Sequence, residues 1–294
     1  MNHQSTSEQI FDWIVNAILA IICILVLYPL LFVLVASFSS PEAVMRGEVW
    51  LWPTNITWIG YLRIFQNIEM LTGYVNTIVY TVVGTAINLI MSVAAAYPLS
   101  RKDFYGRNVI AAMMVFTMFF SGGMVPTYLL VKNLGMLNSM WALLIPGAVS
   151  VYNILIMRTF FANGIPYEMQ EAASIDGCSN MTTLMRIVLP LSMPIIAVMI
   201  LFYSVGHWNA YFSALIYLTD RDKYPLQLFL REILIQGQMQ EMLGIGDDTQ
   251  GQIVLEGEAI KYAVVIVANL PVLLLYPFLQ KYFTKGVMIG AVKG

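Results

Sequence analysis

The sequence predicts an all-α integral membrane protein with six transmembrane helices. Of its residues, 59% are hydrophobic and only 11% are charged, whereas about a quarter of the residues in a soluble globular chain are charged. Several apolar stretches reach the roughly 20 residues that a helix needs to cross the hydrocarbon core of a bilayer. Because these stretches are continuously apolar rather than alternating, they favour helices over a membrane β-barrel.

The first predicted helix covers residues 13–36. No Lys or Arg precedes it and no small-residue cleavage site follows it, so we interpret it as a retained span rather than a signal peptide. The other spans are placed on the successive apolar runs at residues 74–97, 109–131, 140–161, 187–218 and 260–279. In the second span, Asn76 and Asn88 are interpreted as contacts between helices. The cysteines, Cys23 and Cys178, fall at different levels of the membrane, so no disulfide is expected.

Two segments between the predicted spans are long. Residues 37–73 carry Trp50, Trp52 and Trp58, which suit a membrane interface or a helix lying along the surface. Residues 219–258 are polar and rich in Gln and Gly, and they could form a partner-contacting loop or a disordered connector. Basic residues are divided almost equally between the two sides. However, the loops on the side of the termini are shorter, so we expect both termini in the cytoplasm.

Composition and motifs exclude several classes of function. The net charge of −2 provides no basic field for nucleic acid. The sequence lacks a P-loop, a zinc-protease motif and a serine-hydrolase motif, so we expect no catalytic residue, metal site or cofactor in this chain. Of the histidines, His3 lies in the N-terminal tail, while His207 is the only acid or base well inside a predicted span. Coupling to ions needs such groups, so the energy for uphill transport would come from a partner subunit.

A polar stretch, EAASIDGCSNMTTLMRIVLP, separates the fourth and fifth predicted spans at residues 171–190. Gly164 can end the helix before it, and Pro166 suits the first position of a short helix of roughly ten residues. Gly177 can then adopt the left-handed conformation that ends this helix. The stretch therefore begins with a short helix.

A second helix is expected to follow. Ser179 or Asn180 can cap it, and Pro190 and Pro194 would bend the chain as it enters the fifth span. The two short helices together form a helix–turn–helix elbow beneath the membrane.

The surface of this elbow suits a close approach by another protein. Ala172 and Ala173 leave little side chain in the way, and Glu171 offers a charge for a basic residue of a partner. An ordinary amphipathic connector fits the residues equally well.

The stretch fits the pattern E-A-A-x3-G-x9-I-x-L-P without a gap and resembles the EAA loop of membrane subunits of binding-protein-dependent ABC importers. The resemblance implies a type I ABC importer transmembrane domain in which residues 164–190 form a coupling loop that contacts a cytoplasmic ATPase. It implies a second, non-identical permease, two copies of an ABC ATPase that bind ATP and Mg²⁺, and an extracytoplasmic binding protein. The ATPase-coupling residues that it implies are Glu171, Ala172, Ala173, Asp176, Gly177, Ile187, Leu189 and Pro190.

Residues 121–161 and the ending KYFTKGVMIGAVKG resemble the polysaccharide- or lipoprotein-type carbohydrate permeases, which are related to the second permease of the maltose system. The resemblance covers essentially the whole chain and implies one transmembrane domain over residues 1–294, with its core at about 74–280. In the maltose relative, the cytoplasmic tail reaches between the ATPase subunits and the last outer loop contacts the binding protein. Residues 281–294 and 219–258 are the matching candidates, although short tails are often only solvated ends.

The fifth span is unusually rich in polar and aromatic groups. Ser204, His207 and Tyr211 would share a helical face at i, i+3 and i+7. Sugars present hydroxyls for hydrogen bonds and C–H faces for aromatic stacking, so this mixture suits a sugar path. Hydrogen bonding between helices is the alternative. The candidate substrate-pathway residues are Ser204, His207, Trp208, Asn209 and Tyr211, with Tyr152 and Asn153 in the fourth span as a weaker set.

We therefore expect a multi-pass permease of the bacterial inner membrane that imports a carbohydrate, specifically an oligosaccharide, in an ATP-driven ABC importer. An ABC permease for a non-sugar solute and an ion-coupled secondary transporter are the alternatives. Sugar specificity would lie mostly in the binding protein, and both an acidic and a neutral sugar are compatible with this chain.

Overall fold

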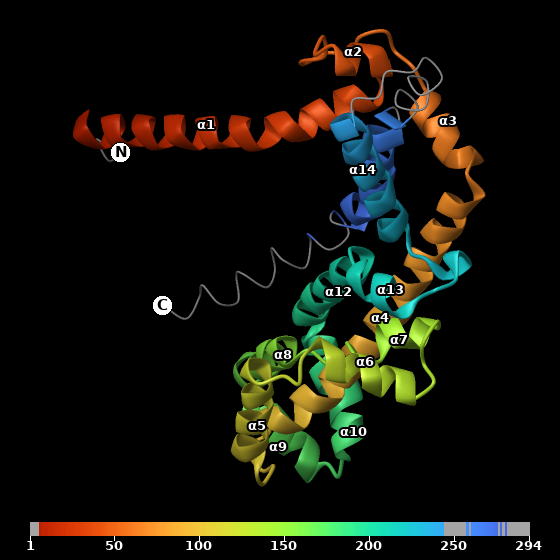
Figure 1. Ribbon diagram of the computed structural model, residues 1–294. Helices are drawn as coiled ribbons and strands as arrows, with labels where there is room; N and C mark the ends of the chain where they lie inside the picture. The colour runs from red at the N-terminus through yellow and green to blue at the C-terminus, as the bar shows by residue number, and fades with distance from the viewer. Residues whose placement is uncertain (1–5, 244–256, 259, 276, 278–279, 281–294) are drawn as a thin grey trace. The chain divides into compact units, whose positions relative to one another are not determined.

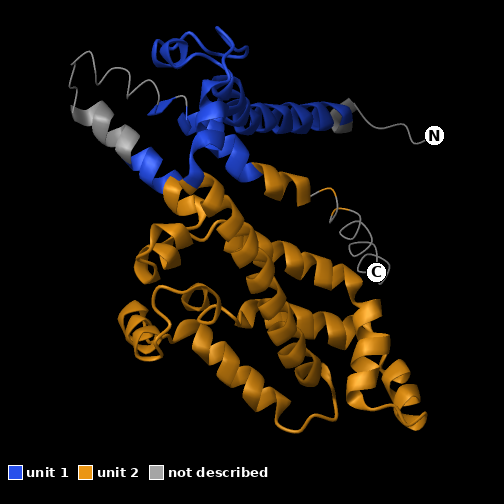
Figure 2. Cartoon of the chain, turned by 90° about the vertical axis from the view of Figure 1, so that its right-hand side faces the viewer, with its two compact units in different colours: residues 1–68, 230–269 blue, residues 69–229, 270–294 orange. Residues whose placement is uncertain are grey.

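The computed structural model describes residues 6–243, 257–258, 260–275, 277 and 280. Every regular element in this part of the chain is a helix, which confirms the all-α fold class (Figure 1). The chain divides into two compact units (Figure 2), one of residues 1–68 and 230–269 and the other of residues 69–229 and 270–294.

The first unit begins with α1 (Thr6–Ser37), a helix of 32 residues. This helix contains the first predicted span, residues 13–36, and starts about two turns earlier. It is long and apolar enough to cross a membrane, and no residue of its most apolar stretch is buried. Such an apolar exposed surface suits a helix that meets lipid.

The segment that follows α1 forms two short helices, α2 (Pro41–Met45) and α3 (Ile59–Gln66). The ring of Phe38 packs against those of Trp58 and Tyr61, with centroids 5.1 and 5.2 Å away. This aromatic group holds the start of α3 against the end of α1, in keeping with the expected surface helix. The indoles that stay most exposed here are those of Trp50 and Trp52.

The second unit is arranged around α4 (Ile68–Ser100), an unbroken helix of 33 residues. It confirms the second predicted span and extends it at both ends. Apolar side chains such as Val82 and Ile90 are exposed, while one face of the helix is polar and buried. Membrane helices pack through small and polar residues and turn their apolar faces to lipid. The buried polar residues of this face are Thr77, Thr81, Thr85, Asn88 and Ser92.

The third predicted span is not a single helix, contrary to expectation. Its residues form α5 (Arg107–Phe119) and α6 (Met124–Asn133), which are bent by 108° from one another. Gly123 lies at the break with φ of +86°, a conformation that glycine adopts at little cost. Hydropathy did not reveal the turn because the residues on both sides of it are apolar.

The fourth predicted span is also divided. A short helix, α7 (Met140–Leu144), is followed by α8 (Val151–Gly164). Pro146 and Gly147 occupy the irregular stretch between them, and Ser150 caps α8 through its hydroxyl. Proline lacks the N–H that would continue the helix, which explains why the apolar run does not form one helix.

The fifth predicted span contains the expected bend. The helical arm before Ser192 and α12 (Met193–Trp208) are bent by 82°, with a proline on each side of Ser192. The span does not continue unbroken to residue 218, because α12 ends at Trp208. There the Asn209 side chain donates to the Val205 carbonyl at 3.0 Å and competes with the backbone ladder. The other elements of this region are α10 (Asn180–Thr183), a π-helix (Leu184–Val188), α11 (Leu189–Leu191) and α13 (Phe212–Tyr217).

The predicted outer loop at residues 219–258 contains a helix, α14 (Leu226–Leu243). A disordered connector is therefore the wrong interpretation for that part of the loop. The sixth predicted span is described as the apolar helix Ile260–Leu275. The predicted tail, residues 281–294, lies outside the described residues, so its role stays a prediction.

The main apolar core of the second unit joins α4, α8 and α12. Ile154 and Met157 of α8 and Met199 of α12 are fully buried in it. In lipid, van der Waals packing rather than transfer from water holds such helices together. Since α8 leads directly into the polar stretch at residues 171–190, this core supports that stretch at one end of the unit.

Candidate functional site

The first half of the polar stretch is a helix, α9 (Tyr167–Ile175), of nine residues. The preceding α8 ends at Gly164, as predicted, and Ile165 is buried in the core. Pro166 is the N-cap of α9 rather than its first residue. A short helix is therefore present where the sequence predicted one, with its beginning displaced by one position.

The end of α9 is closed by a Schellman motif. Gly177 has φ of +75°, the left-handed conformation expected of it. Its N–H donates to the Ser174 carbonyl at 3.1 Å, and the Cys178 N–H donates to the Ala173 carbonyl at 2.9 Å. These two bonds satisfy carbonyl groups that the end of a helix leaves unpaired, so Gly177 fixes where the chain leaves α9.

The surface of α9 agrees only partly with the prediction. Glu171, Ala172 and Asp176 are exposed and accessible to another protein. Ala173, in contrast, is 4% exposed and lies on the inner face of the helix with Gln170, three residues before it. The close-approach surface therefore includes Ala172 but not Ala173, whose small side chain instead lets α9 lie close to its own unit.

The second half of the stretch forms the other arm of the elbow. Ser179 caps α10, accepting from the Thr182 N–H at 3.2 Å. Ile187 lies in the π-helix, while Leu189 and Pro190 lie in α11. These three residues shape the arm and its bend rather than extend the exposed face of α9. This arm lines a pocket of about 800 Å³, which Arg101 and Asp103 also line.

The turn from α4 to α5 carries a polar cluster that the sequence did not single out. Arg101 donates to both carboxylate oxygens of Asp103, at 2.8 and 2.7 Å, and to the hydroxyl of Tyr97 at 3.1 Å. Hydrogen bonding by this guanidinium lowers the pKa of Asp103 below its ordinary value. Arg107 donates to the Arg101 carbonyl at 2.9 Å and closes the turn.

The predicted sugar path contains a chain of hydrogen bonds that joins three segments. His207 of α12 and Asn88 of α4 lie 2.6 Å apart, Nε2 to Oδ1, and the Asn88 amide donates to the Gly147 carbonyl at 2.6 Å. Since the amide nitrogen of Asn88 is the donor to Gly147, its oxygen accepts, and His207 Nε2 carries a hydrogen. The expected role of Asn88 as a contact between helices is confirmed.

The other predicted path residues do not share one face. Ser204 is buried and its hydroxyl donates to the Leu201 carbonyl at 3.1 Å. Tyr211 lies after the end of α12, so the expected i, i+7 relationship with Ser204 is wrong. Trp208 is buried and its ring packs against that of Tyr74. Asn153 is also buried, whereas Asn209 and Tyr152 are exposed.

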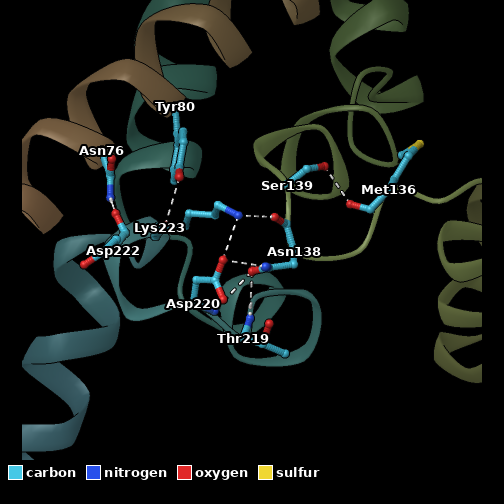
Figure 3. A network of polar contacts seen from close by, with 9 residues as sticks. All are labelled: Asn76, Tyr80, Met136, Asn138, Ser139, Thr219, Asp220, Asp222 and Lys223. Atoms are coloured by element: carbon cyan, nitrogen blue, oxygen red, sulfur yellow. Dashed lines mark hydrogen bonds and ion pairs between the residues drawn. The ribbon is translucent and has the colours of Figure 1, made fainter.

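A second network of hydrogen bonds, around Asn138, lies near the start of α4, at the other end of that helix from Arg101 (Figure 3). The Asn138 side-chain oxygen accepts from the N–H groups of Thr219 and Asp220 at 3.2 and 3.1 Å. Its amide donates to the Asp220 carboxylate at 2.7 Å. Asn138 has φ of +56°, which asparagine tolerates better than most residues. It therefore joins the loop before α7 to the loop after α13.

Lys223 and α4 complete this Asn138 network. The Lys223 ammonium donates to the Asn138 carbonyl at 2.9 Å and to the Asp220 carboxylate at 2.8 Å. Hydrogen bonds from Lys223 and then from Asn138 lower the pKa of Asp220. Asn76 and Tyr80 of α4 donate to backbone carbonyls of the same loop, at 2.7 and 2.9 Å. This network could not be predicted from the sequence, because its members are far apart along the chain.

The apolar helices, the buried polar face of α4 and the elbow of α9 define a multi-pass membrane protein of the transporter type. Residues 70–289 match the family described as "Binding-protein-dependent transport system inner membrane component", and the chain belongs to that family. This result confirms the resemblance carried by the EAA pattern. The chain is thus a membrane transport component that works with a separate binding protein.

Two relatives from Bacillus subtilis strain 168 match nearly the whole chain. The chain is 42% identical to the polygalacturonan/rhamnogalacturonan transport system permease protein YtcP over 98% of this chain and 99% of the relative. It is 39% identical to the protein LplC over 99% of this chain and 98% of the relative. A chain in the crystal structure of a bacterial ABC transporter involved in the import of the acidic polysaccharide alginate matches with a TM-score of 0.86. The chain in the crystal structure is 32% identical to this one, and the match covers 96% of this chain and 100% of the chain in the crystal structure.

Proposed function

We propose that this chain is the permease subunit of an ATP-driven ABC importer that carries an oligosaccharide across the bacterial inner membrane. The observation that carries the proposal is the α9 elbow within a chain of the binding-protein-dependent family. Its exposed Glu171 and Ala172 form a small, charged surface suited to a protein cleft. The partners are two ATPase subunits, a second permease and an extracytoplasmic binding protein.

In this proposal, α9 faces the cytoplasm and contacts the ATPase, which binds ATP and Mg²⁺. Closure of the ATPase subunits moves α9, and the Schellman turn at Gly177 passes the movement to the second arm of the elbow. The bend at Ser192 then changes the inclination of α12, which carries His207. Movement of α12 opens or closes the path on which the sugar crosses.

The substrate proposed is an oligosaccharide from an acidic polysaccharide. The names of one close relative and of the similar solved structure support this class, since both refer to acidic polysaccharides. In this chain, the candidate-path side chains that stay exposed are those of Tyr152, Asn209 and Tyr211, whose hydroxyl and amide groups and aromatic rings suit hydroxyl-rich solutes. Specificity for the sugar's charge rests mainly with the binding protein.

Uptake by the complete complex tests the proposal. The four kinds of subunit are reconstituted in proteoliposomes, and ATP-dependent entry of labelled oligogalacturonides is compared with that of neutral oligosaccharides and amino acids. We expect uptake of the acidic oligosaccharides that requires hydrolysable ATP and the binding protein. Uptake driven by an ion gradient without ATP would contradict the importer assignment, and exclusive uptake of amino acids would contradict the substrate class.

Variants of α9 test the coupling surface. Glu171→Lys and Gly177→Val are expected to abolish uptake and the stimulation of ATPase activity by the loaded binding protein. The matched control is Glu42→Lys, which reverses an exposed charge on α2, away from the elbow in sequence and in the other unit. Full activity of both α9 variants would show that the elbow does not couple transport to ATP.

A further inference from the structure

The first residue of α9 has a partner outside the elbow. Lys102, in the turn between α4 and α5, places its ammonium over the ring of Tyr167, 4.6 Å from the ring centroid. A cation at this distance is attracted by the electron-rich face of the ring. Lys102 is itself exposed, so its side chain covers the ring from the solvent side.

The turn that contains Lys102 is held by hydrogen bonds of the residues before and after it. Arg101, the preceding residue, makes two hydrogen bonds to Asp103, the following one. Arg107 donates to the Arg101 carbonyl, and Gly106 supplies the positive φ of +82° with which the turn enters α5. These bonds fix the backbone at Lys102, so its contact with Tyr167 joins α9 to an ordered turn rather than to a loose loop.

The same end of α4 is tied to the helix that leads into α9. Arg158 of α8 donates to the Leu99 carbonyl near the end of α4 at 3.0 Å. The start of α9 is therefore joined to α4 through α8 and, separately, through Lys102 and Tyr167. The other end of α9 has a different connection, through Gly177 to the arm that leads to α12.

We propose that Lys102 and Tyr167 form a positioning contact that carries the movement of α9 to α4 and α5. The inference rests on the proposed function, because it adds a second route by which the movement that the ATPase imposes on α9 is transmitted. The first route follows the chain through Gly177 to α12. The second passes through the contact between Lys102 and Tyr167 to α4, which contains Asn88 of the candidate path. Moving both helices together keeps the Asn88–His207 contact intact while the path changes its access.

The test measures the number of sugar molecules imported per ATP hydrolysed by the complete complex in proteoliposomes. Lys102→Met keeps the aliphatic stem and removes the charge, while Tyr167→Leu removes the ring. Each is expected to lower this ratio by about two- to fivefold, the range that corresponds to an exposed cation–ring contact. The matched controls are Lys102→Arg, which keeps a cation, and Tyr167→Phe, which keeps the ring, and both should retain the original ratio.

The double variant Lys102→Met/Tyr167→Leu separates a shared contact from two independent roles. If the residues act through each other, the double variant loses no more than either single variant. Multiplied losses would overturn the proposal, since Tyr167 would then act alone, for instance on the ATPase surface. An unchanged ratio in Lys102→Met would overturn it as well, and because Lys102 is exposed this variant is expected to fold.

The outcome for the original complex distinguishes this inference from the proposed function. ATP-driven uptake by the original complex together with an unchanged ratio in Lys102→Met rejects the contact alone. No ATP-driven uptake of any solute by the original complex rejects the proposed function and the contact with it. The amount of ATPase that copurifies with the Lys102→Met complex should equal the amount that copurifies with the original complex. This is expected because Lys102 positions α9 and does not hold the complex together.

Discussion

The side chains of Asn88 and His207 lie 2.6 Å apart although 119 residues separate them in the sequence. Asn88 uses its oxygen for His207 and its amide for the carbonyl of Gly147, at the break between α7 and α8. One asparagine thus connects α4, α12 and the irregular part of the fourth predicted span. Any rearrangement of α12 relative to α4 must therefore either preserve the hydrogen bond between His207 and Asn88 or break it.

Replacing Asn88 with Ala is expected to destabilise the protein. Asn88 is 2% exposed, so the variant leaves the His207 N–H and the Gly147 carbonyl without their partner. Hydrogen bonds between membrane helices contribute up to about 1–2 kcal/mol, and we expect a loss in that range, seen as a lower midpoint of thermal unfolding in detergent.

Asn76→Ala provides the matched control for Asn88. It also removes an asparagine of α4, whose amide donates to the carbonyls of Asp222 and Tyr224. The shorter of these bonds, to Asp222, is exposed, so water can replace it. The midpoint of Asn76→Ala should fall less than that of Asn88→Ala. Equal midpoints for the two variants would show that the buried connection adds nothing to stability.

Gly84 leaves the space that His207 occupies. A Cβ at Gly84 would lie 2.5 Å from His207 Nε2 and 2.6 Å from Cε1, closer than atoms in contact approach. Gly84→Ala should therefore displace the imidazole and lower both the unfolding midpoint and sugar uptake. Adding His207→Ala should restore the unfolding midpoint relative to Gly84→Ala, because it removes the side chain that clashes.

Gly206→Ala is the control for this substitution. No described atom outside its own helix lies within 4 Å of a Cβ built at Gly206, and alanine favours helix over glycine by about 1 kcal/mol. We expect an unchanged or higher unfolding midpoint. A loss as large as that of Gly84→Ala would mean that any glycine substitution, and not contact with His207, is responsible.

Features of the fold that depend on neighbouring residues were predictable from the sequence. Gly177 and Ser179 end and begin helices through bonds to residues within five positions. The sequence predicted the role of Gly177 and left Ser179 and Asn180 as alternatives for the cap, of which the structure has Ser179. The 82° bend beside Pro190 was also predicted, because proline acts on its own helix. Hydropathy located the apolar runs but did not reveal their breaks, since Gly123 and Pro146 interrupt the helix without interrupting the apolar run.

Contacts between distant segments were not predictable in this way. Asn138 and Asp220 are 82 residues apart, and neither is unusual in its local sequence. Ala173 was assigned to the exposed face together with Ala172, although consecutive residues on a helix point in directions about 100° apart. Which of the two alanines is buried depends on how α9 lies against the rest of its unit, and this was known only from the structure.

The Asp220 carboxylate makes the Asn138 network sensitive to acid. Its pKa is lowered from the ordinary value of 3.8 by hydrogen bonds from Lys223 and Asn138. A group with a lowered pKa in the folded state adds stability that is fully present above the ordinary pKa and is lost as the pH falls through the lower value. The unfolding midpoint of the original protein should therefore exceed that of Asp220→Asn at pH 6 and approach it as the pH falls below 3.8.

Asp222→Asn is the control for the acid dependence. Asp222 joins the network through its backbone carbonyl, which accepts from Asn76 at 2.7 Å, and the substitution leaves this bond in place. The unfolding midpoint of this variant should follow that of the original protein from pH 6 to pH 3. If Asp220→Asn behaves in the same way as Asp222→Asn at pH 6, the Asp220 carboxylate does not stabilise the loop.

The conformation of Gly177 leads to a prediction that distinguishes backbone geometry from side-chain size. Gly177 has φ of +75°, and no described atom lies within 4 Å of a Cβ placed on it. The position therefore has space for a side chain, but its backbone conformation disfavours most residue types. Asparagine tolerates the left-handed conformation, whereas a β-branched residue does not. Gly177→Asn should therefore retain most ATP-dependent uptake and Gly177→Val should lose it, because only the second removes the bonds that close α9. Uptake measured in proteoliposomes alongside the recovery of assembled complex tests this, and equal uptake by both variants would show that transport does not depend on the Schellman turn.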